Sequence, residues 1–280
     1  MTLGELRRAI RQQLKQANVE TPDLDARILL CESLDCGRAD LILNQELPIS
    51  GQDTNHTLLL CARRAAGEPI DHILGYREFY GRRFTVNAHV LSPRPETELL
   101  VEKALGTLQN KAANILELGA GSGALAITLA LENPKLSLTA TDISEAALKV
   151  ARENAKRHNT DNRVTFLCGD WFAPVPQTHF DLIISNPPYI DGQAMALLSP
   201  EVKNFDPDLA LYGGEDGLAA YRHIAAHCAG YLTPKGWLML EIGYDQGASV
   251  STLLKDHGFQ SISVGKDLSG HNRIISAQHP

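Results

Sequence analysis

The chain has 280 residues, of which 44% are hydrophobic, so it can form one large packed domain or two smaller ones. Its 26 basic and 33 acidic residues give a formal net charge of −7, which speaks against a surface built to bind phosphate backbones. Five cysteines without a CxxC pair indicate a reducing compartment rather than a disulfide framework. The sequence shows no signal peptide and no membrane span, so we expect a cytoplasmic protein.

The first part of the chain carries helical patterns over 3–17, 22–29, 39–43 and 54–66. Thr2 and Glu5 form a capping box at the start of the first helix, and Gly67 ends the last. Each apolar stripe is narrow, so the helices must pack on one another. We therefore predict a separate N-terminal helical domain over residues 1–73; its separateness suggests a recognition role, which the family resemblance described below also implies.

Two short strand patterns follow at 76–80 and 83–86, around Gly81-Arg82. They predict a β-hairpin that joins two domains, within a linker spanning 74–91. Further strand patterns lie at 115–118, 136–141, 164–168, 182–185, 237–242, 261–264 and 273–277. Helical patterns begin at Ser122 and Ser144 and also cover 218–229 and 248–257. This alternation over 92–280 predicts an α/β domain with a Rossmann-like, mainly parallel sheet of seven strands and helices on both faces.

A glycine-rich segment, Glu117-Leu118-Gly119-Ala120-Gly121-Ser122-Gly123, lies where a strand turns into a helix. Backbone amides there can approach an anionic group of a ligand, and with Ala124 the segment also fits a dinucleotide fingerprint. Asp142 ends the next strand, where a carboxylate can accept both hydroxyls of a ribose. An adenosine cofactor is therefore expected. In the alternative reading the glycines only form a turn and Asp142 only caps the helix at Ser144.

Asn186-Pro187-Pro188-Tyr189 follows directly on the apolar run at 180–185. The two prolines fix the backbone and remove two donors, so the carbonyl groups there are free to accept from a ligand. A carboxamide beside the flat ring of Tyr189 suits a planar amide or an exocyclic amine. The alternative is a strand end with a proline-stiffened turn and no ligand.

The glycine loop, Asp142 and this motif together resemble class I S-adenosylmethionine-dependent methyltransferases that act on planar nitrogen. Other segments are similar to the PrmC/HemK family, namely Ser92-Pro93-Arg94-Pro95-Glu96-Thr97-Glu98, Gly169-Asp170-Trp171-Phe172, Glu201-Val202 with Phe205 and Pro207, Gly213-Gly214-Glu215-Asp216-Gly217 and Glu241-Ile242-Gly243. That family methylates the side-chain nitrogen, N5, of the glutamine in the Gly-Gly-Gln motif of bacterial peptide chain release factors. The resemblance implies a protein-(glutamine-N5) methyltransferase of translation termination with S-adenosyl-L-methionine as cofactor and release factors as partners.

The resemblance also implies roles for single positions. Asn186 and the Pro187 carbonyl hold the substrate amide, and Tyr189 with Pro188 encloses its plane, so Asn186, Pro187 and Tyr189 are the expected catalytic residues. Arg94 and Glu96 are expected to contact the substrate as well. The expected cofactor-binding residues are Glu117, Gly119, Ala120, Gly121, Ser122, Gly123, Asp142, Trp171 and Asn186. Glu117 faces the cationic amine of the cofactor or accepts from loop amides, and Trp171 lies by the ligands or is a half-buried interface aromatic.

Several rival interpretations share part of this pattern. An amino-methyltransferase for adenine or guanine uses the same catalytic logic, but the acidic charge balance disfavours nucleic acid. A ribosomal-protein glutamine methyltransferase, a non-catalytic adaptor and an NAD dehydrogenase are further alternatives; the segment from Arg94 to Glu98 favours the release-factor enzyme. His223 and His227 lack the glutamate of a HExxH motif, so no metal site is expected. We expect a monomer that does not bind membranes.

Overall fold

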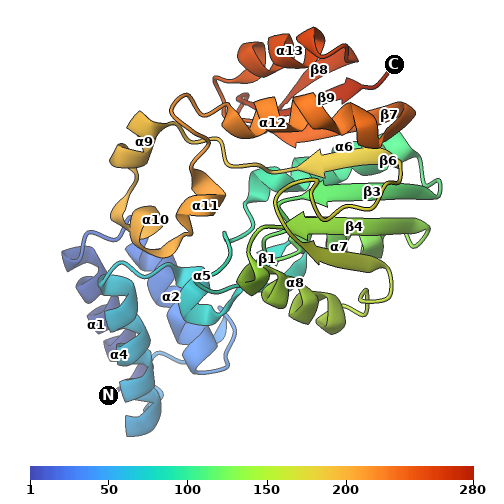
Figure 1. The fold of residues 1–280 in the computed structure, drawn as a ribbon. Coiled ribbons are helices and arrows are strands. Elements are labelled where there is room, and N and C mark those ends of the chain that lie inside the picture. Colours follow the sequence, from blue (N-terminus) through green and yellow to red (C-terminus); the bar gives the residue numbers. More distant parts are fainter. The chain divides into compact units, whose positions relative to one another are not determined.

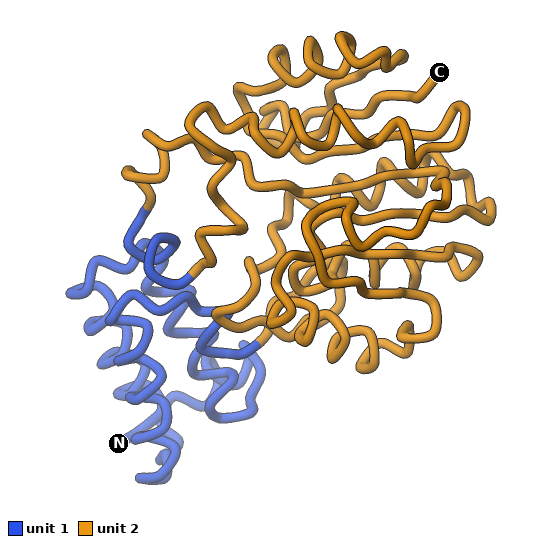
Figure 2. Tube along the Cα trace, in the orientation of Figure 1, with its two compact units in different colours: residues 1–75, 199–205 blue, residues 76–198, 206–280 orange.

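The computed structural model describes residues 1–280, which form two compact units (Figure 2). Unit 1 comprises Met1–Gly75 and Ser199–Phe205, and unit 2 comprises Tyr76–Leu198 and Asp206–Pro280. The second stretch of unit 1 interrupts unit 2 in the chain. No pattern in the sequence indicated this excursion.

Unit 1 is entirely helical (Figure 1). Its helices are α1 (Leu3–Gln16), α2 (Pro22–Ser33), α3 (Asp40–Leu43), α4 (Gly51–Ala65), α5 (Ile70–Leu74) and α10 (Pro200–Phe205). The predicted capping box is present: the Thr2 hydroxyl accepts from the Glu5 amide, and the Glu5 carboxylate accepts from the Thr2 amide. α4 begins earlier than its apolar pattern, because Ser50 caps it through the Asp53 amide. Apolar stripes of α1, α2 and α4 form the core.

One buried ion pair crosses this helical core. The guanidinium of Arg64, on α4, donates to Asp25 on α2 at 2.6 Å and to Glu201 on α10 at 2.9 Å. The side chains of Arg64 and Asp25 are only 7% and 4% exposed, so each charge depends on the other for compensation. Arg64 therefore joins the returning segment of the chain to the helices of unit 1.

Unit 2 contains a seven-stranded sheet in the order β5-β4-β3-β6-β7-β9-β8 (Figure 1). The strands are β3 (Ala113–Leu118), β4 (Leu136–Asp142), β5 (Val164–Cys168), β6 (Phe180–Ser185), β7 (Leu232–Glu241), β8 (Gln260–Lys266) and β9 (Asn272–Gln278). The pairs among β3 to β7 are parallel, whereas β9 runs antiparallel to β7 and β8. The predicted seven-stranded, mainly parallel α/β sheet is confirmed.

Alternate side chains of the central strands enter two different apolar cores. Ile115 and Leu182 pack in the core that includes α6 (Glu98–Leu108), α7 (Ala124–Glu132) and α8 (Glu145–Arg157). Leu116 and Ile183 pack in the core that includes α12 (Ala219–His227) and α13 (Gly247–Asp256). Because strand side chains alternate in direction, the sheet is covered by helices on both faces. Burying each such Leu or Ile contributes about 1.5–3 kcal/mol.

The β-hairpin is formed by β1 (Tyr76–Phe79) and β2 (Arg82–Thr85). Its turn is Tyr80-Gly81, one residue earlier than the sequence suggested, and both turn residues have positive φ, 50° and 70°. Such values match a two-residue turn whose twist suits a hairpin. Asn154, on α8, is fully buried. Its side chain accepts from the Thr85 amide and donates to the Thr85 and Ser122 carbonyls, so it links the hairpin to the glycine loop.

Several elements were not predicted from the sequence. They are α6, the 3₁₀ turn η1 (Pro95–Thr97) before it, the turn η2 (Cys228–Tyr231), the helices α5 and α10 of unit 1, and α9 (Gly192–Leu197) and α11 (Asp208–Leu211), which follow the Asn-Pro-Pro-Tyr segment. None of the helices is both long enough and apolar enough to cross a membrane.

The Arg64 ion pair yields a prediction about stability. Replacing Arg64 by Met leaves the Asp25 carboxylate buried without its partner, which should cost about 3 kcal/mol. Hydrogen exchange of the α1, α2 and α4 amides measures this loss within unit 1. Arg63→Met is the matched control, because Arg63 pairs with Glu68 at a half-exposed position and should cost under about 1 kcal/mol. Equal losses in the two variants would contradict the assignment.

Candidate active site

The site forms where the carboxyl ends of β3 and β6 meet. These parallel neighbours are in register, with Leu118 opposite Ser185. The Ser185 hydroxyl, fully buried, donates to the Leu118 carbonyl at 2.6 Å. From this point the chain continues as the glycine loop on one side and as Asn186 on the other. The strand order reverses direction between β3 and β6, the position at which open α/β sheets bind ligands.

The glycine loop is held closely by the end of β4. The Gly119 and Ala120 amides donate to the Thr141 carbonyl at 2.8 and 2.9 Å. The Asp142 carboxylate accepts from Gly121 at 2.8 Å and from Ser144, at the start of α8, at 2.8 Å. Asp142 therefore fixes both the loop and the helix, as the capping alternative required, while it also lines the cavity described below.

These bonds correct one expectation about the loop. The amides of Gly119, Ala120, Gly121 and Gly123 already donate to protein oxygens, so they do not form the open anion cradle that the glycine pattern suggested. Gly119 and Gly121 have positive φ, and a Cβ on either would meet nothing within 4 Å. Gly123 serves packing instead, because a Cβ there would lie 3.1 Å from the Ala151 Cβ on α8.

A cavity of about 380 Å³ opens beside the loop. The predicted site residues that line it are Arg94, Glu117, Gly119, Ala120, Gly121, Ser122, Asp142, Trp171, Asn186 and Pro188. Four others do not line it: Glu96, Gly123, Pro187 and Tyr189. Residues predicted to bind cofactor and residues predicted to hold substrate thus share one cavity.

Two acidic side chains, Glu117 and Asp142, line this cavity. Glu117 is 3% exposed, and burial raises its pKa well above the usual value, opposed by a hydrogen bond from the Ala126 amide and reinforced by the charge of Asp142. One carboxylate oxygen of Glu117 accepts a hydrogen bond of 3.1 Å from the Ala126 amide, near the start of α7. This agrees with the alternative in which Glu117 accepts from backbone amides. A cation between Glu117 and Asp142 would compensate both charges.

Two hydroxyl groups near the cavity lack partners. Ser92 and Thr141 are among the lining residues, and their side-chain oxygens are buried with no hydrogen-bond partner within the protein, which is uncommon for buried polar groups. Glu117 for a cationic amine and Asp142 for ribose hydroxyls fit S-adenosylmethionine. The sequence reasoning assigned no role to Ser92 or Thr141, although Ser92 begins a quoted motif.

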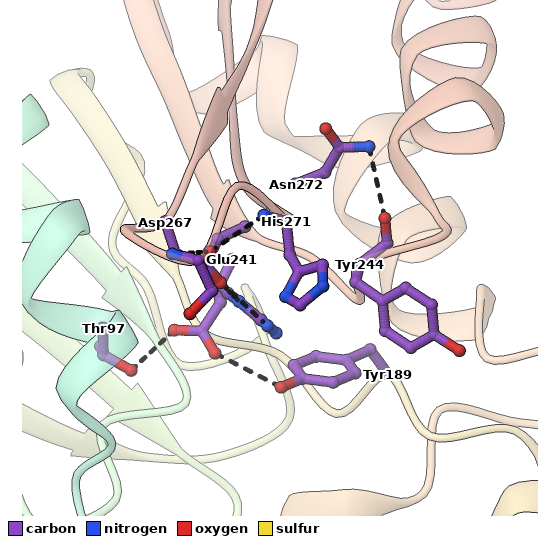
Figure 3. Close-up of polar contacts among 9 residues, drawn as sticks. Thr97, Tyr189, Glu241, Tyr244, Asp267, His271 and Asn272 are labelled. Carbon is purple, nitrogen blue, oxygen red and sulfur yellow. Dashed lines mark hydrogen bonds and ion pairs between the residues drawn. The ribbon is translucent and has the colours of Figure 1, made fainter.

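The Asn-Pro-Pro-Tyr segment is anchored by the side chains of Thr97, Glu241 and Gln246. Figure 3 shows Thr97 and Glu241 near Tyr189. The Asn186 amide nitrogen donates to the Thr97 hydroxyl at 3.2 Å, and the Tyr189 hydroxyl donates to the Glu241 carboxylate at 3.4 Å. Gln246 donates to the Tyr189 carbonyl at 3.0 Å. Sequence reasoning gave Thr97, Glu241 and Gln246 no role; the only signal was that Thr97 and Glu241 lie in motifs shared with a family.

Within this segment the residues differ in burial. Pro187 is buried, Pro188 is half-buried at the cavity, and Tyr189 is half-buried with its ring packed against the core that holds α12 and α13. Burial, reinforced by the nearby charge of Glu241, raises the pKa of Tyr189 to about 12. Its hydroxyl therefore stays protonated at neutral pH and remains a donor.

The remaining predicted positions lie around the cavity. Arg94 is exposed and pairs with Asp206 at 3.0 Å, whereas Glu96 is half-buried on η1. Trp171 lines the cavity and also lies 5.8 Å from the His223 ring, so it combines both alternatives that the sequence left open. His223 and His227 stack at 4.4 Å, and no group of three or more potential ligands is arranged to hold a metal ion.

Comparisons with known proteins agree with this geometry. Residues 5–75 match the family model of the PrmC N-terminal domain, and residues 95–201 match the methyltransferase small domain. The release factor glutamine methyltransferase of Cereibacter sphaeroides is 42% identical, covering 100% of this chain and 99% of its own. That of Vibrio cholerae is 41% identical, with 100% and 97% covered. A methyltransferase structure from Pyrococcus furiosus superposes with a TM-score of 0.56 at 19% identity, over 78% of this chain and 96% of that one.

The fold and the site define a class I S-adenosylmethionine-dependent methyltransferase. Within that class, the chain belongs to the release factor glutamine methyltransferase family, because its similarity to those relatives extends over the full length of both proteins.

Glycines after α11 yield a prediction about the catalytic segment. A Cβ at Gly213 would lie 2.7 Å from the Tyr189 Cα and 2.8 Å from the Pro188 carbonyl oxygen, both backbone atoms. Gly213→Ala should displace the Asn-Pro-Pro-Tyr segment and lower kcat/KM for methyl transfer about a hundredfold. Calorimetry should find S-adenosylmethionine binding nearly unchanged.

The matched control is Gly230→Ala, where a Cβ meets nothing within 4 Å. It should leave both quantities at their original values. Full activity of Gly213→Ala would show that the backbone contact does not hold the segment.

Proposed function

We propose that the protein transfers a methyl group from S-adenosyl-L-methionine to the side-chain amide nitrogen, N5, of the glutamine in the Gly-Gly-Gln motif of peptide chain release factors. One observation carries this proposal: the Asn186 side chain lines the same cavity as Glu117 and Asp142. A group able to hold a planar amide therefore adjoins the place that suits a cationic methyl donor. The relatives named release factor glutamine methyltransferases support the choice of substrate.

The chemical task is to position a weak nucleophile. An amide nitrogen shares its lone pair with the carbonyl group, so its π density must be aimed at the methyl group. The Asn186 side-chain oxygen and the Pro187 carbonyl would each accept one N–H of the substrate amide at about 2.7–3.2 Å. Holding reactants in this way can supply about 7–11 kcal/mol of the barrier. The cofactor supplies a methyl group already activated by its sulfonium charge.

The residues around Asn186 limit how the amide lies. Pro188 lines the cavity and would provide a flat surface against which the amide plane can pack. Tyr189, whose ring packs against the core and whose hydroxyl bonds Glu241, would instead hold the segment in place. A strong base is unnecessary in this scheme, because the amide proton can leave to water after the methyl group has transferred. Neither carboxylate of the cavity is required as a base, and both are better employed in compensating the cationic cofactor.

A labelling experiment tests the substrate. Purified protein with labelled S-adenosylmethionine should label whole release factor and should not label a release factor in which the Gly-Gly-Gln glutamine is replaced by alanine. Duplex DNA, ribosomal RNA and ribosomal protein are the rival acceptors and should stay unlabelled. Label on one of these, with none on the release-factor glutamine, would overturn the proposal.

The same assay includes a variant of the catalytic segment as an internal control. Asn186→Ala should abolish labelling while calorimetry still detects cofactor binding, since the Glu117 and Asp142 side chains are untouched. Turnover comparable to that of the unmodified protein would remove Asn186 from the mechanism.

We further propose that unit 1 recognises the body of the release factor. It has an apolar core of its own and matches the PrmC N-terminal domain over 5–75. Ile42 and Leu43 of this unit are 62% and 79% exposed, which is unusual for adjacent large apolar side chains without a partner.

Substitution of these two residues tests the role of unit 1. The double variant Ile42→Ser with Leu43→Ser should lower kcat/KM for whole release factor about tenfold and leave kcat/KM for a short Gly-Gly-Gln peptide unchanged. Leu59→Ser, at an equally exposed position of α4, is the control and should affect neither substrate. Equal loss on protein and peptide would indicate a purely structural role.

A further inference from the structure

A chain of hydrogen bonds lies behind the catalytic carboxamide; we call Asn186, Thr97, Glu241 and Tyr189 the Asn186 relay. Figure 3 shows three of its members, Thr97, Glu241 and Tyr189. Asn186 donates to the Thr97 hydroxyl at 3.2 Å, and that hydroxyl donates to one oxygen of Glu241 at 2.6 Å. The other oxygen of Glu241 accepts from Tyr189 at 3.4 Å. Thr97 and Glu241 are 7% and 1% exposed, so water does not replace these bonds.

Each hydrogen bond of the relay has a defined donor and acceptor, which follow from the number of protons that each group carries. An ionised carboxylate only accepts, so Glu241 takes the single proton that the Thr97 hydroxyl can donate. The short distance of 2.6 Å is typical of a hydroxyl bonded to a charged acceptor. The Thr97 oxygen is then left to accept, and the partner it faces must offer an N–H. Asn186 therefore turns its NH₂ group to Thr97, and its carbonyl oxygen is the polar atom that remains for the substrate.

We infer that Thr97 and Glu241 are positioning residues that set the polarity of Asn186, so that the site accepts an amide NH₂ and rejects a carboxylate. This inference rests on the proposed function. It assigns the enzyme's discrimination between glutamine and glutamate to two buried side chains, neither of which needs to touch the substrate. Thr97 acts through Asn186, and Glu241 acts through Thr97.

The direction of the relay reverses when Glu241 becomes a donor. A protonated Glu241, or a glutamine in its place, can donate to the Thr97 oxygen, and the Thr97 proton then turns toward Asn186. The carboxamide of Asn186 must rotate to accept it, which presents NH₂ to the substrate. Two NH₂ groups facing each other repel, whereas NH₂ facing a carboxylate attracts.

The surroundings of Glu241 place this reversal near neutral pH. Burial raises its pKa to about 7, opposed by the Thr97 bond, by the charge of Arg273 and by the Tyr189 bond, and reinforced by the charge of Glu96. Tyr221, on α12, donates to the Glu241 backbone carbonyl at 3.0 Å, and burial raises its pKa, so it stays neutral. Glu241 is ionised above this pKa, so the amide-accepting direction is present at higher pH and is lost as pH falls through about 7.

Three variants and one control test the relay in the full-length protein. Thr97→Val removes the hydroxyl, Thr97→Ser keeps it, and Glu241→Gln replaces the acceptor by a group that can donate. Thr128→Val is the matched control, because the buried Thr128 hydroxyl has no partner to lose. For each protein we would measure kcat and KM on whole release factor across pH, the Kd of S-adenosylmethionine, and the Kd of a release factor whose Gly-Gly-Gln glutamine is replaced by glutamate.

Thr97→Val should lower kcat/KM about tenfold to a hundredfold, a loss typical of removing an orienting partner, while Thr97→Ser and Thr128→Val retain most activity. Glu241→Gln should be weakly active, without the fall in kcat/KM around pH 7 that we expect of the unmodified enzyme. It should also bind the glutamate-containing release factor about tenfold more tightly than the unmodified enzyme does. Cofactor Kd should not change in any of them.

Two outcomes would overturn the inference: an unmodified enzyme whose kcat/KM is flat across pH 7, or a Glu241→Gln protein whose preference for glutamine over glutamate is unchanged. Thermal unfolding distinguishes a folding defect from a loss of orientation. Glu241→Gln removes a buried charge, so at alkaline pH this variant should not unfold at a lower temperature than the unmodified enzyme. If Thr97→Val fails to fold, the pH profile and the Glu241→Gln arm still decide. Failure of the proposed function is distinguishable from failure of this inference, because the unmodified enzyme would then not label the release-factor glutamine.

Discussion

The parallel pairing of β3 with β6 is the constraint on which the rest of the site depends. It places Leu118 opposite Ser185, and the buried Ser185 hydroxyl bonds the Leu118 carbonyl. Two segments far apart in the sequence, one that suits the methyl donor and one that suits the acceptor, therefore start from paired positions. A register shift of one residue would turn every side chain of β6 to the other face of the sheet. The two half-sites could then no longer share a cavity.

Electrostatics divides the site into two regions with different tasks. Glu117 and Asp142 line the cofactor region, and burial raises the pKa of Glu117 well above its usual value; a cationic ligand beside it would favour the ionised form. The acceptor region uses neutral groups, the Asn186 carboxamide and the backbone, because a fixed charge there would favour a charged ligand over an amide. The charge of Glu241 lies behind Thr97, where it directs hydrogen bonds without facing the substrate.

Much of the fold was predictable because local patterns agreed with the final structure. Strand patterns alternating with helical patterns located all seven strands of the sheet, and glycine at positive φ marked the loop after β3. The short helices α9 and α11 were missed because helices of six and four residues are too short to show an apolar stripe. The hairpin turn was misplaced by one residue because Tyr80, unlike Gly81, shows no sequence preference for positive φ.

The sequence alone determined which functional groups the site contains: a glycine loop after a strand, an acidic strand end, and a carboxamide held between a strand and two prolines. Those features depend on residue type and local spacing, which the sequence states directly. Only the tertiary structure decided which partners surround them, such as Thr97 and Glu241 behind Asn186, or Asp142 holding the loop amides that were expected to be free. Such hydrogen bonds join residues up to 144 positions apart, and their direction depends on burial and ionisation, which no local pattern records.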